Sequence, residues 1–212
     1  MRVTKHEHAT LRIEREGATL VIDPGGFTPP LAGLENVVGL VLTHEHPDHW
    51  TPEHVADLRD RFPGIVILAT QAVADATDAS VIVVRPGDTA TAGPFRLEFF
   101  GGTHNEIHSS IPLVDNVGVF VDDTLYYPGD SYAVPEGRDV PLLAAPVGAP
   151  WLKIGEAMDF VLAVGPREAF GTHDVPLSRE GLGMHRARLR WATEQGGGVF
   201  HDLDAGEAIE VG

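Results

Sequence analysis

The sequence predicts an α/β sandwich with its β-sheets inside and its helices outside. Two observations lead to this fold class: short apolar runs of strand length recur along the chain, and helical patterns are interspersed among them. The chain has 212 residues, which is enough for one well-buried domain but too few for two independent ordinary domains. Because neither a clear repeat nor a linker interrupts it, we treat residues 1–212 as a single unit.

The first predicted strands form a hairpin. Residues 11–15 alternate apolar and charged side chains, and a turn at Glu16-Gly17 separates them from the apolar run 19–22. The next run, residues 37–42, is continuously apolar and ends at a group of histidines. A buried strand whose end opens onto a loop has this pattern, so we expect the histidines at a strand end.

A helix is predicted directly after the histidines. Thr51 supplies an N-cap, Pro52 suits the first helical position, and Glu53 makes the first turn acidic. Farther along, strand-like runs cover residues 65–69, 81–84, 95–100, 117–121, 124–127 and 142–145, and helical patterns cover residues 71–79, 154–164 and 178–195. Segments 24–33 and 135–150 are rich in proline and glycine and are predicted as surface loops near a site.

Charge and composition narrow the classes of function. The formal charge of -16 disfavours nucleic acid and anionic lipid as partners, so we expect a small-molecule substrate. No apolar run approaches the roughly 20 residues that span a bilayer, and the N-terminus has no signal core, which favours a cytoplasmic location. Because the chain contains no cysteine, a metal site must use His, Asp and Glu. The oligomeric state stays open, a homo-oligomer included.

Four metal-competent side chains lie close together in the run Thr43-His44-Glu45-His46-Pro47-Asp48-His49. At an extended strand end, His44 and His46 would project to the same side. Asp48 and His49 follow a proline and could turn toward a second position, so that one segment would feed two adjacent cations. The alternative is a solvated histidine-rich loop without metal. The buried strand before the run and the presence of Asp48 favour the metal site.

This run resembles the signature of the metallo-β-lactamase superfamily. Further segments resemble other motifs of that superfamily in the same chain order: Ile22-Asp23-Pro24-Gly25, Gly102-Thr103-His104, Tyr127-Pro128-Gly129-Asp130-Ser131 and Gly171-Thr172-His173-Asp174. The matching segments span nearly the whole chain. The resemblance implies a four-layer αββα sandwich whose site lies at one edge, between the two sheets.

The resemblance also implies a site for two divalent metal ions. One ion would be held by His44, His46 and His104, the other by Asp48, His49 and His173, and Asp130 would bridge them. Asp23 would accept a hydrogen bond from a ligand histidine and so orient it. Imidazoles and carboxylates suit Zn²⁺, which is our first choice, and they also accept Mn²⁺ or Fe.

Within the superfamily, His8-Ala9-Thr10 before an amphipathic strand resembles the branch related to ascorbate-6-phosphate lactonase. The chain is shorter than that lactonase and lacks room for its additions, which leaves the substrate open. We consider Asp48, His8 and His108 as candidate catalytic residues that contact the substrate or transfer a proton. For His8 and His108, a packing or surface role is an equal alternative.

We therefore expect a metal-dependent hydrolase in which a hydroxide bridging two metal ions attacks a small ester, lactone or phosphoester. A phosphodiesterase or nuclease is one alternative, which the acidity of the chain disfavours. A metal-binding protein without catalysis is the other alternative. Such a protein would have a closed site, whereas the Gly/Pro-rich loops predict an opening.

Overall fold

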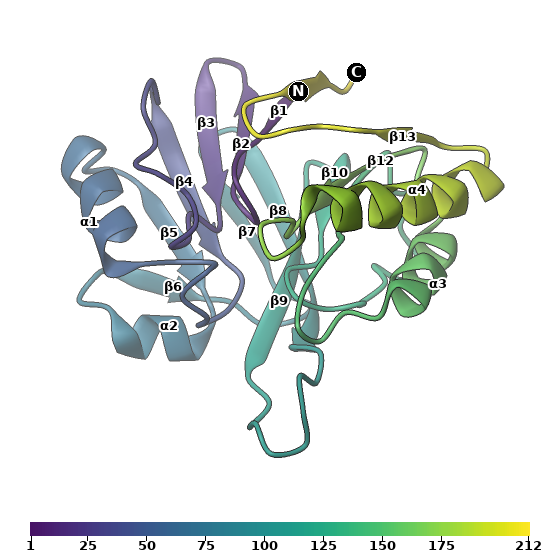
Figure 1. The fold of residues 1–212 in the computed structure, drawn as a ribbon. Coiled ribbons are helices and arrows are strands. Elements are labelled where there is room, and N and C mark those ends of the chain that lie inside the picture. Colours follow the sequence, from purple (N-terminus) through teal and green to yellow (C-terminus); the bar gives the residue numbers. More distant parts are fainter.

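Two seven-stranded sheets pack face to face in the computed structural model, which describes residues 1–212 (Figure 1). The first sheet has the strand order β14-β1-β2-β3-β4-β5-β6. Its strands are β1 (Arg2–Lys5), β2 (Leu11–Arg15), β3 (Ala18–Ile22), β4 (Val37–Leu42), β5 (Val66–Ala69), β6 (Val81–Val83) and β14 (Ala208–Glu210). Strands β3 to β6 run parallel, whereas β1, β2 and β14 are antiparallel to their neighbours, so the sheet is mixed.

The second sheet has the strand order β13-β12-β11-β10-β9-β8-β7. Its strands are β7 (Thr89–Ala92), β8 (Phe95–Thr103), β9 (Asp115–Val121), β10 (Leu125–Tyr127), β11 (Leu142–Pro146), β12 (Glu168–Thr172) and β13 (Val199–His201). Strands β10 to β13 run parallel and β7 to β10 antiparallel, so this sheet repeats the mixed organisation of the first.

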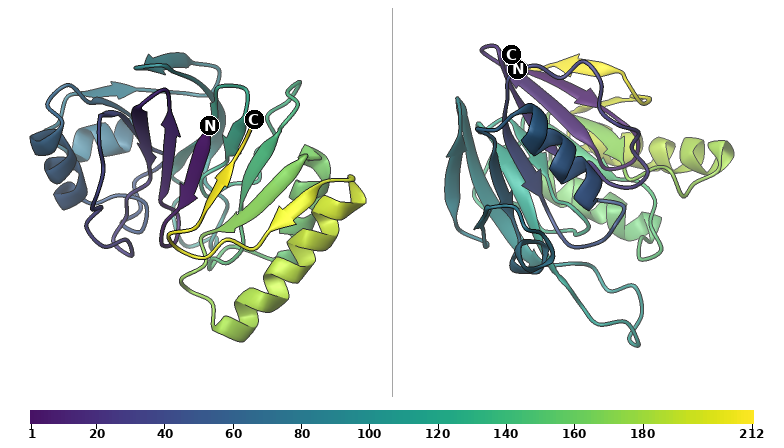
Figure 2. Two further views of the ribbon diagram at one scale, coloured as in Figure 1. Left: turned by 90° about the horizontal axis from the view of Figure 1, so that it is seen from above. Right: turned by 90° about the vertical axis from the view of Figure 1, so that its left-hand side faces the viewer.

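Two helices cover the outer face of each sheet, which gives the four layers expected for an αββα sandwich (Figures 1 and 2). Helices α1 (Pro52–Arg61) and α2 (Gln71–Ala76) pack on the first sheet through Val55, Leu58 and Val73. Helices α3 (Ile154–Val164) and α4 (Arg179–Gln195) pack on the second sheet, and Phe160 and Leu189 are buried there. Figure 2 also shows the two termini side by side, where β1 pairs with β14.

Alternation along the strands divides the apolar residues among three cores. In β9, Val119 and Val121 belong to the core between the sheets, whereas Phe120 points to the opposite face and packs in the core under α3 and α4. In β4, Val41 faces the central core and Leu40 faces the core under α1 and α2. Burying such a side chain stabilises the fold by about 1.5–3 kcal/mol, so the sandwich is a rigid frame for the loops at its edge.

The structure confirms the predicted elements with shifts at their ends. Helix α1 begins as predicted, because Thr51 Oγ1 accepts a hydrogen bond from the His54 amide at 3.2 Å. The helix predicted at 71–79 ends earlier, at Ala76, because Thr77 is extended and its hydroxyl accepts from the Ala79 amide. Segment 135–150 is not a surface loop throughout, because it contains the buried strand β11. Strands β1, β7, β12, β13 and β14 were not predicted.

Five strands direct the chain to one edge of the sandwich. Strand β3 ends just before Asp23, β4 just before Thr43, β8 just before His104 and β12 just before His173. Strand β10 ends three residues before Asp130. Because β3 and β4 run parallel, and β8, β10 and β12 share one direction in the other sheet, their ends meet at this edge. No helix of the protein is both long and apolar enough to span a membrane.

Candidate metal centre

The residues predicted from the motifs converge at this edge in two groups and a bridge. One group consists of His44, His46 and His104, whose candidate ligand atoms all lie within 4.8 Å of one another. The His44 and His46 ring centroids are 4.8 Å apart, and those of His46 and His104 are 4.6 Å apart. The run is not extended as expected, because β4 ends at Leu42 and the segment from His44 to His49 runs through bends and turns. It nevertheless brings two histidines of one segment together with a third from the other sheet.

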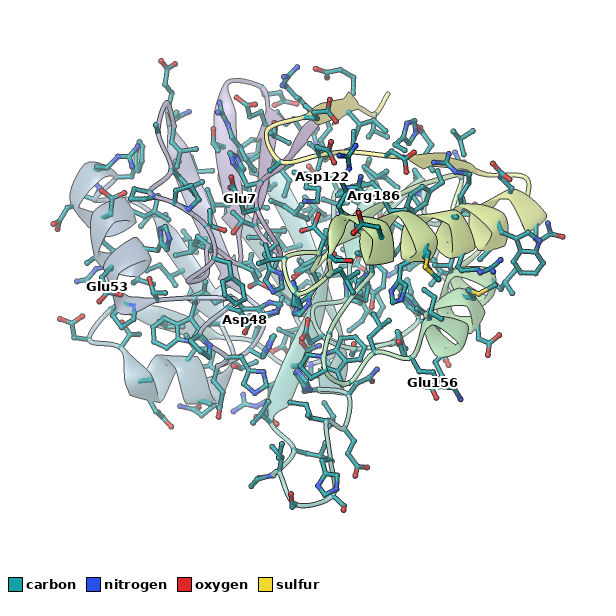
Figure 3. The ribbon with its side chains drawn as sticks, in the orientation of Figure 1. Glu7, Asp48, Glu53, Asp122, Glu156 and Arg186 are labelled. Atoms are coloured by element: carbon teal, nitrogen blue, oxygen red, sulfur yellow. The ribbon has the colours of Figure 1, made fainter.

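The second group consists of Asp48, His49 and His173, and His8 joins it. His173 Nε2 lies 3.4 Å from Asp48 Oδ2, and His8 Nε2 lies 3.1 Å from the same oxygen. Figure 3 shows Asp48 near the middle of the molecule, between the half that carries α1 and α2 and the half that carries α3 and α4. The turn after Pro47 thus does what the sequence suggested, because it sends Asp48 and His49 toward a second position.

Asp130 lies between the two groups. Its Oδ1 is 3.1 Å from His49 Nε2, and its Oδ2 is 3.3 Å from His104 Nε2 and 3.1 Å from His173 Nε2. Trp151 Nε1 donates a hydrogen bond to Oδ2 at 2.8 Å, which fixes the carboxylate. A carboxylate so placed can contact cations on both sides at once.

The nitrogens at the centre of the cluster are free to bind metal. Nε2 is buried in His44, His49, His104 and His173 and meets the geometry of a hydrogen bond in none of them, and the same holds for Asp130 Oδ1. Except in His44, these nitrogens lie 3.1–3.4 Å from carboxylate oxygens of Asp130 or Asp48. Burying a polar group without a partner costs free energy, so five such atoms facing one another are not explained by packing. Divalent cations that accept imidazole and carboxylate ligands would satisfy all five, so the residues fit the metal that the sequence motifs imply.

The opposite ring nitrogens are held by the protein. Nδ1 lies 3.0 Å from Thr43 Oγ1 in His44, 2.7 Å from Asp23 Oδ2 in His49, and 2.5 Å from backbone carbonyl oxygens in His104 and His173. When Nδ1 donates to an oxygen, Nε2 is left unprotonated and able to bind a metal ion. Each of these rings is therefore anchored on one side and available on the other.

Asp23 is the main anchor of the loop that carries the histidine run. It accepts hydrogen bonds from the Thr43 amide at 2.8 Å, the Thr43 hydroxyl at 2.6 Å, His49 Nδ1 at 2.7 Å and the Tyr127 hydroxyl at 3.0 Å. Its φ of 46° places it in the left-handed region, where aspartate is better tolerated than most residues. The structure thus places Asp23 behind a candidate ligand, as the sequence suggested.

The cluster is open to solvent on one side. His44, His49, His104 and His173 are buried, whereas His46 is half-buried and the Asp48 side chain is 26% exposed. Structural zinc sites are closed by protein ligands, and catalytic sites keep a position open. The partial exposure of His46 and Asp48 therefore leaves one side of the cluster in contact with solvent, as a catalytic site requires.

Charges in the metal-free cluster are balanced between its two sides. Burial keeps the pKa of His44 well below its ordinary value, so this ring is neutral. Burial also opposes the charged form of His173, but the neighbouring Asp130 outweighs it and raises the pKa to about 9. Asp130 is buried too, yet the facing His49 and His173 hold its pKa well below the usual range. His44 is thus neutral, whereas His49 and His173 hold protons that a metal ion must displace.

His108 is not brought into the cluster. It is exposed on the loop between β8 and β9, and its Nδ1 contacts the Ser110 hydroxyl at 2.7 Å. Its catalytic role stays a prediction. His8, by contrast, is fully buried against Asp48 and His173.

Sequence reasoning missed three residues that support the cluster. Trp151 holds Asp130, Tyr127 donates to Asp23, and Lys5 forms a buried ion pair with Asp174, next to His173. Tyr127 belongs to the motif that contains Asp130, so the sequence offered a signal for it. Neither Trp151 nor Lys5 lies in a motif, and only the folded chain brings them to the site.

A family model described as a beta-lactamase superfamily domain matches residues 2–173 of the chain. That range contains every residue of the cluster. Protein Rv0786c of Mycobacterium tuberculosis is 31% identical over 194 residues, which cover 89% of this chain and 91% of the relative. The similarity therefore extends over most of both proteins.

Solved structures share the fold. A protein from Parabacteroides distasonis, described as a metal-dependent hydrolase, is similar with a TM-score of 0.79 and 19% identity, covering 96% of this chain and 92% of that one. A metallo hydrolase from the archaeon Ignicoccus hospitalis is similar with a TM-score of 0.74 and 16% identity, covering 98% and 97%. At these identities the likeness concerns the fold, and activity must be argued from the site.

Proposed function

The chain belongs to the beta-lactamase superfamily, and from this premise we propose that it is a hydrolase that binds two divalent metal ions at the cluster. Zinc is our first choice, with Mn²⁺ or Fe as alternatives that the same ligand types accept. The substrate we propose is a small ester, lactone or phosphoester. The structures named above as a metal-dependent hydrolase and a metallo hydrolase support this class of chemistry.

One observation carries the proposal: unpaired buried nitrogens converge on a centre that is open to solvent at His46 and Asp48. A histidine cluster that only stabilised the fold would not need the opening. A solvated histidine-rich loop without metal would not have buried nitrogens without partners. The combination supports a metal site that acts on a bound molecule.

The seven candidate ligands would divide between two metal positions. His44, His46 and His104 would hold one ion, Asp48, His49 and His173 the other, and Asp130 would contact both. When bound, such ions supply an activated water near neutral pH and polarise the substrate's reacting oxygen. Asp23, Thr43 and Trp151 keep the ligand atoms aimed at the centre.

Asp48 is the residue we propose for moving a proton to the leaving group. Burial opposes the charged form of its carboxyl, but contacts with His173 and His8 outweigh this effect and hold its pKa below the ordinary value. The carboxylate is therefore ionised and would first accept a proton from the attacking water and then pass it to the leaving group. Asp48 is also the more solvent-exposed of the two carboxylates in the cluster, at 26% against 4% for Asp130. A leaving group that departs toward solvent would pass the Asp48 carboxylate.

The charges around the site favour an ester or lactone over a phosphoester or nucleic acid. Lys5 and Arg186 lie beside His173, but both pair with Asp174, at 2.8 Å and 3.7 Å. These two cations are therefore neutralised by Asp174 and do not offer a binding site for a substrate phosphate. The formal charge of -16 also opposes the approach of a polyanion.

The proposal is tested with protein that is stripped of metal and reloaded separately with Zn²⁺, Mn²⁺ or Fe²⁺. Metal content is measured by elemental analysis, and each form is screened against esters, lactones, including phosphorylated sugar lactones, and phosphodiesters. We expect hydrolysis of at least one ester or lactone class. If all three fully loaded forms are inactive on the whole panel, the chain is not the hydrolase proposed here.

The substitution Asp130→Ala separates an enzyme from a non-catalytic metal protein. In an enzyme, loss of the carboxylate should reduce kcat/KM by about 100-fold or more while the circular dichroism spectrum stays that of the wild type. In a structural site, the same change should lower the melting temperature of the loaded protein instead. Tight, strongly salt-dependent RNA binding would favour the nuclease alternative.

A further inference from the structure

The loop between β1 and β2 contacts the second group from outside the histidine run. Its residue His8 is fully buried and has a φ of 60°, in the left-handed region. His8 Nε2 lies 3.1 Å from Asp48 Oδ2, and the His8 and His173 rings are in contact, with centroids 3.9 Å apart and planes tilted by 50°. One side chain thus touches two of the three residues that would hold the second ion.

His8 differs from the candidate ligands in the surroundings of its Nδ1. In His44, His49, His104 and His173, Nδ1 is held by a protein oxygen and Nε2 faces the centre of the cluster. In His8, Nε2 contacts a carboxylate and Nδ1 is buried without a partner. A metal-bound imidazole almost always donates its other N–H to an acceptor, which His8 Nδ1 lacks. His8 is therefore built as a donor to Asp48.

The His8 backbone and the Lys5 side chain hold the turn that contains His173. The His173 amide donates to the His8 carbonyl at 2.8 Å, and His173 itself has a φ of 59°, which few residues other than glycine adopt without support. Lys5, at the end of β1, pairs through Nζ with Asp174 Oδ2 at 2.8 Å, and its side chain is only 1% exposed. Its Nζ also lies 3.1 Å from the His6 carbonyl oxygen.

Stability alone does not account for the Lys5–Asp174 pair. Desolvating a lysine and an aspartate costs about as much as their attraction returns, and an apolar pair of similar volume is often as stable or more so. The best attested use of such a pair is to fix the register of the segments that it joins. Here those segments are the end of β1 and the turn that carries His173.

We propose that His8 and the Lys5–Asp174 ion pair are positioning residues for the second metal position. His8 orients Asp48, and the ion pair holds the turn that presents His173. The group of His44, His46 and His104 has neither contact, so the first metal position does not depend on them. This inference rests on the two-metal function proposed above.

The test measures stepwise zinc affinities of the full-length metal-free protein by calorimetry with a competing chelator. His8→Phe keeps a ring that can contact His173 but removes the donor, whereas His8→Gln keeps an N–H donor. Both substitutions carry similar backbone strain at the left-handed position, so they form a matched pair. We expect one of the two stepwise affinities, which belongs to the second metal position and is called the second affinity here, to fall about 10–100-fold in His8→Phe and to be restored to within about threefold of the wild type in His8→Gln. The other affinity should not change.

Cobalt spectra of the same variants distinguish a positioning residue from a ligand. At saturating Co²⁺, the visible bands of both His8 variants should match those of the wild type, because the atoms bound to the ions are the same. A spectrum with altered band positions or intensities would mean that His8 itself is a ligand. That result would overturn the positioning role.

The ion pair is tested with the double substitution Lys5→Met/Asp174→Leu, which replaces it with apolar side chains. The free energy of unfolding of the metal-free protein should stay close to the wild-type value, while the second zinc affinity falls about 10-fold or more. Glu98→Gln is the control, because the Glu98 side chain is only 11% exposed and forms an ion pair with Arg138 at 2.7 Å, but does not contact the cluster. Its two zinc affinities should equal those of the wild type.

If the wild type binds two ions and the variants bind both as tightly, the inference is wrong and the proposed function stands. If both affinities fall together in the variants, the residues support the fold in general and the positioning role is refuted. If the wild type binds a single ion, the two-metal function fails, and this inference fails with it.

Discussion

Some side chains at the site each hold several neighbouring residues in place through hydrogen bonds. Asp23 is the clearest example, because its two oxygens accept hydrogen bonds from both donors of Thr43, from His49 and from Tyr127. Its carboxylate is fully buried, so each donor depends on it for a partner. Asp23 therefore connects the first sheet, the histidine loop and the second sheet at one point.

We predict that Asp23→Ala lowers the free energy of unfolding of the metal-free protein by about 3–5 kcal/mol, because it leaves buried donors unpaired. Urea denaturation followed by circular dichroism measures this change. Asp123→Ala is the control, since Asp123 has a similar φ of 49° but its side chain is 61% exposed. That substitution should cost about 0.5 kcal/mol or less. Equal losses in the two variants would contradict the anchoring role of Asp23.

Among elements, two loops approach so closely that only glycine fits between them. A Cβ on Gly25, in the loop after β3, would lie 1.8 Å from the carbonyl oxygen of Asp48. The next residue, Gly26, donates its amide to the Pro47 carbonyl at 2.8 Å. The loop that contains Asp48 and His49 therefore packs directly against the backbone of Gly25 and Gly26.

Gly25→Ala should displace this loop and lower the free energy of unfolding by about 1–3 kcal/mol, because the backbone of Asp48 must move. The same variant should bind zinc more weakly. Gly64→Ala is the control, since a Cβ on Gly64 meets nothing within 4 Å. Thermal melts and zinc titrations of both variants provide the comparison, and wild-type zinc affinity in Gly25→Ala would refute the support role of this loop.

The elements that could be predicted from the sequence are those in which the hydrophobic pattern and the residues that begin or end an element agree. The alternation of residues 11–15, the apolar run of β4 and the Thr51-Pro52-Glu53 helix start were visible because each is a local signal. Strand β7 was missed because its residues Thr-Ala-Thr-Ala are small and carry no strong apolar alternation. Strand β14 has three residues and depends on pairing with β1 at the other end of the chain, which no local pattern encodes.

In the metal cluster, too, residues with a local sequence signal were predicted and residues that depend on distant contacts were not. Residues that follow a strand within a recognisable motif were predicted, and the structure brings all seven of them together. His8 was predicted as a candidate without a defined role, and the structure gives it a partner in Asp48. Lys5 and Trp151 could not be predicted, because their contacts join segments that are distant in sequence.

At the scale of the whole molecule, the metal site couples to folding through charge. The raised pKa of His173 means that the metal-free native state keeps a proton that the unfolded chain releases near pH 6.5. This contribution to stability is fully present below pH 6.5 and is lost as the pH rises through about 9. Metal binding removes the same proton, so the loaded protein lacks this dependence.

We predict that the melting temperature of the metal-free protein falls between pH 6.5 and about 9, with a loss from His173 of roughly 3 kcal/mol in unfolding free energy. The zinc-loaded protein should show a much flatter profile over this range. Calorimetric scans of both forms in the same buffers measure the difference. Parallel profiles would contradict the coupling between the cluster's charge and the fold.

Anomalous diffraction at the zinc edge, from crystals of the zinc-loaded protein, would locate the bound ions. We expect two peaks, one among His44, His46 and His104 and one among Asp48, His49 and His173, with Asp130 in contact with both. A single peak, or peaks held by other residues, would contradict the two-metal site from which the proposed hydrolysis follows.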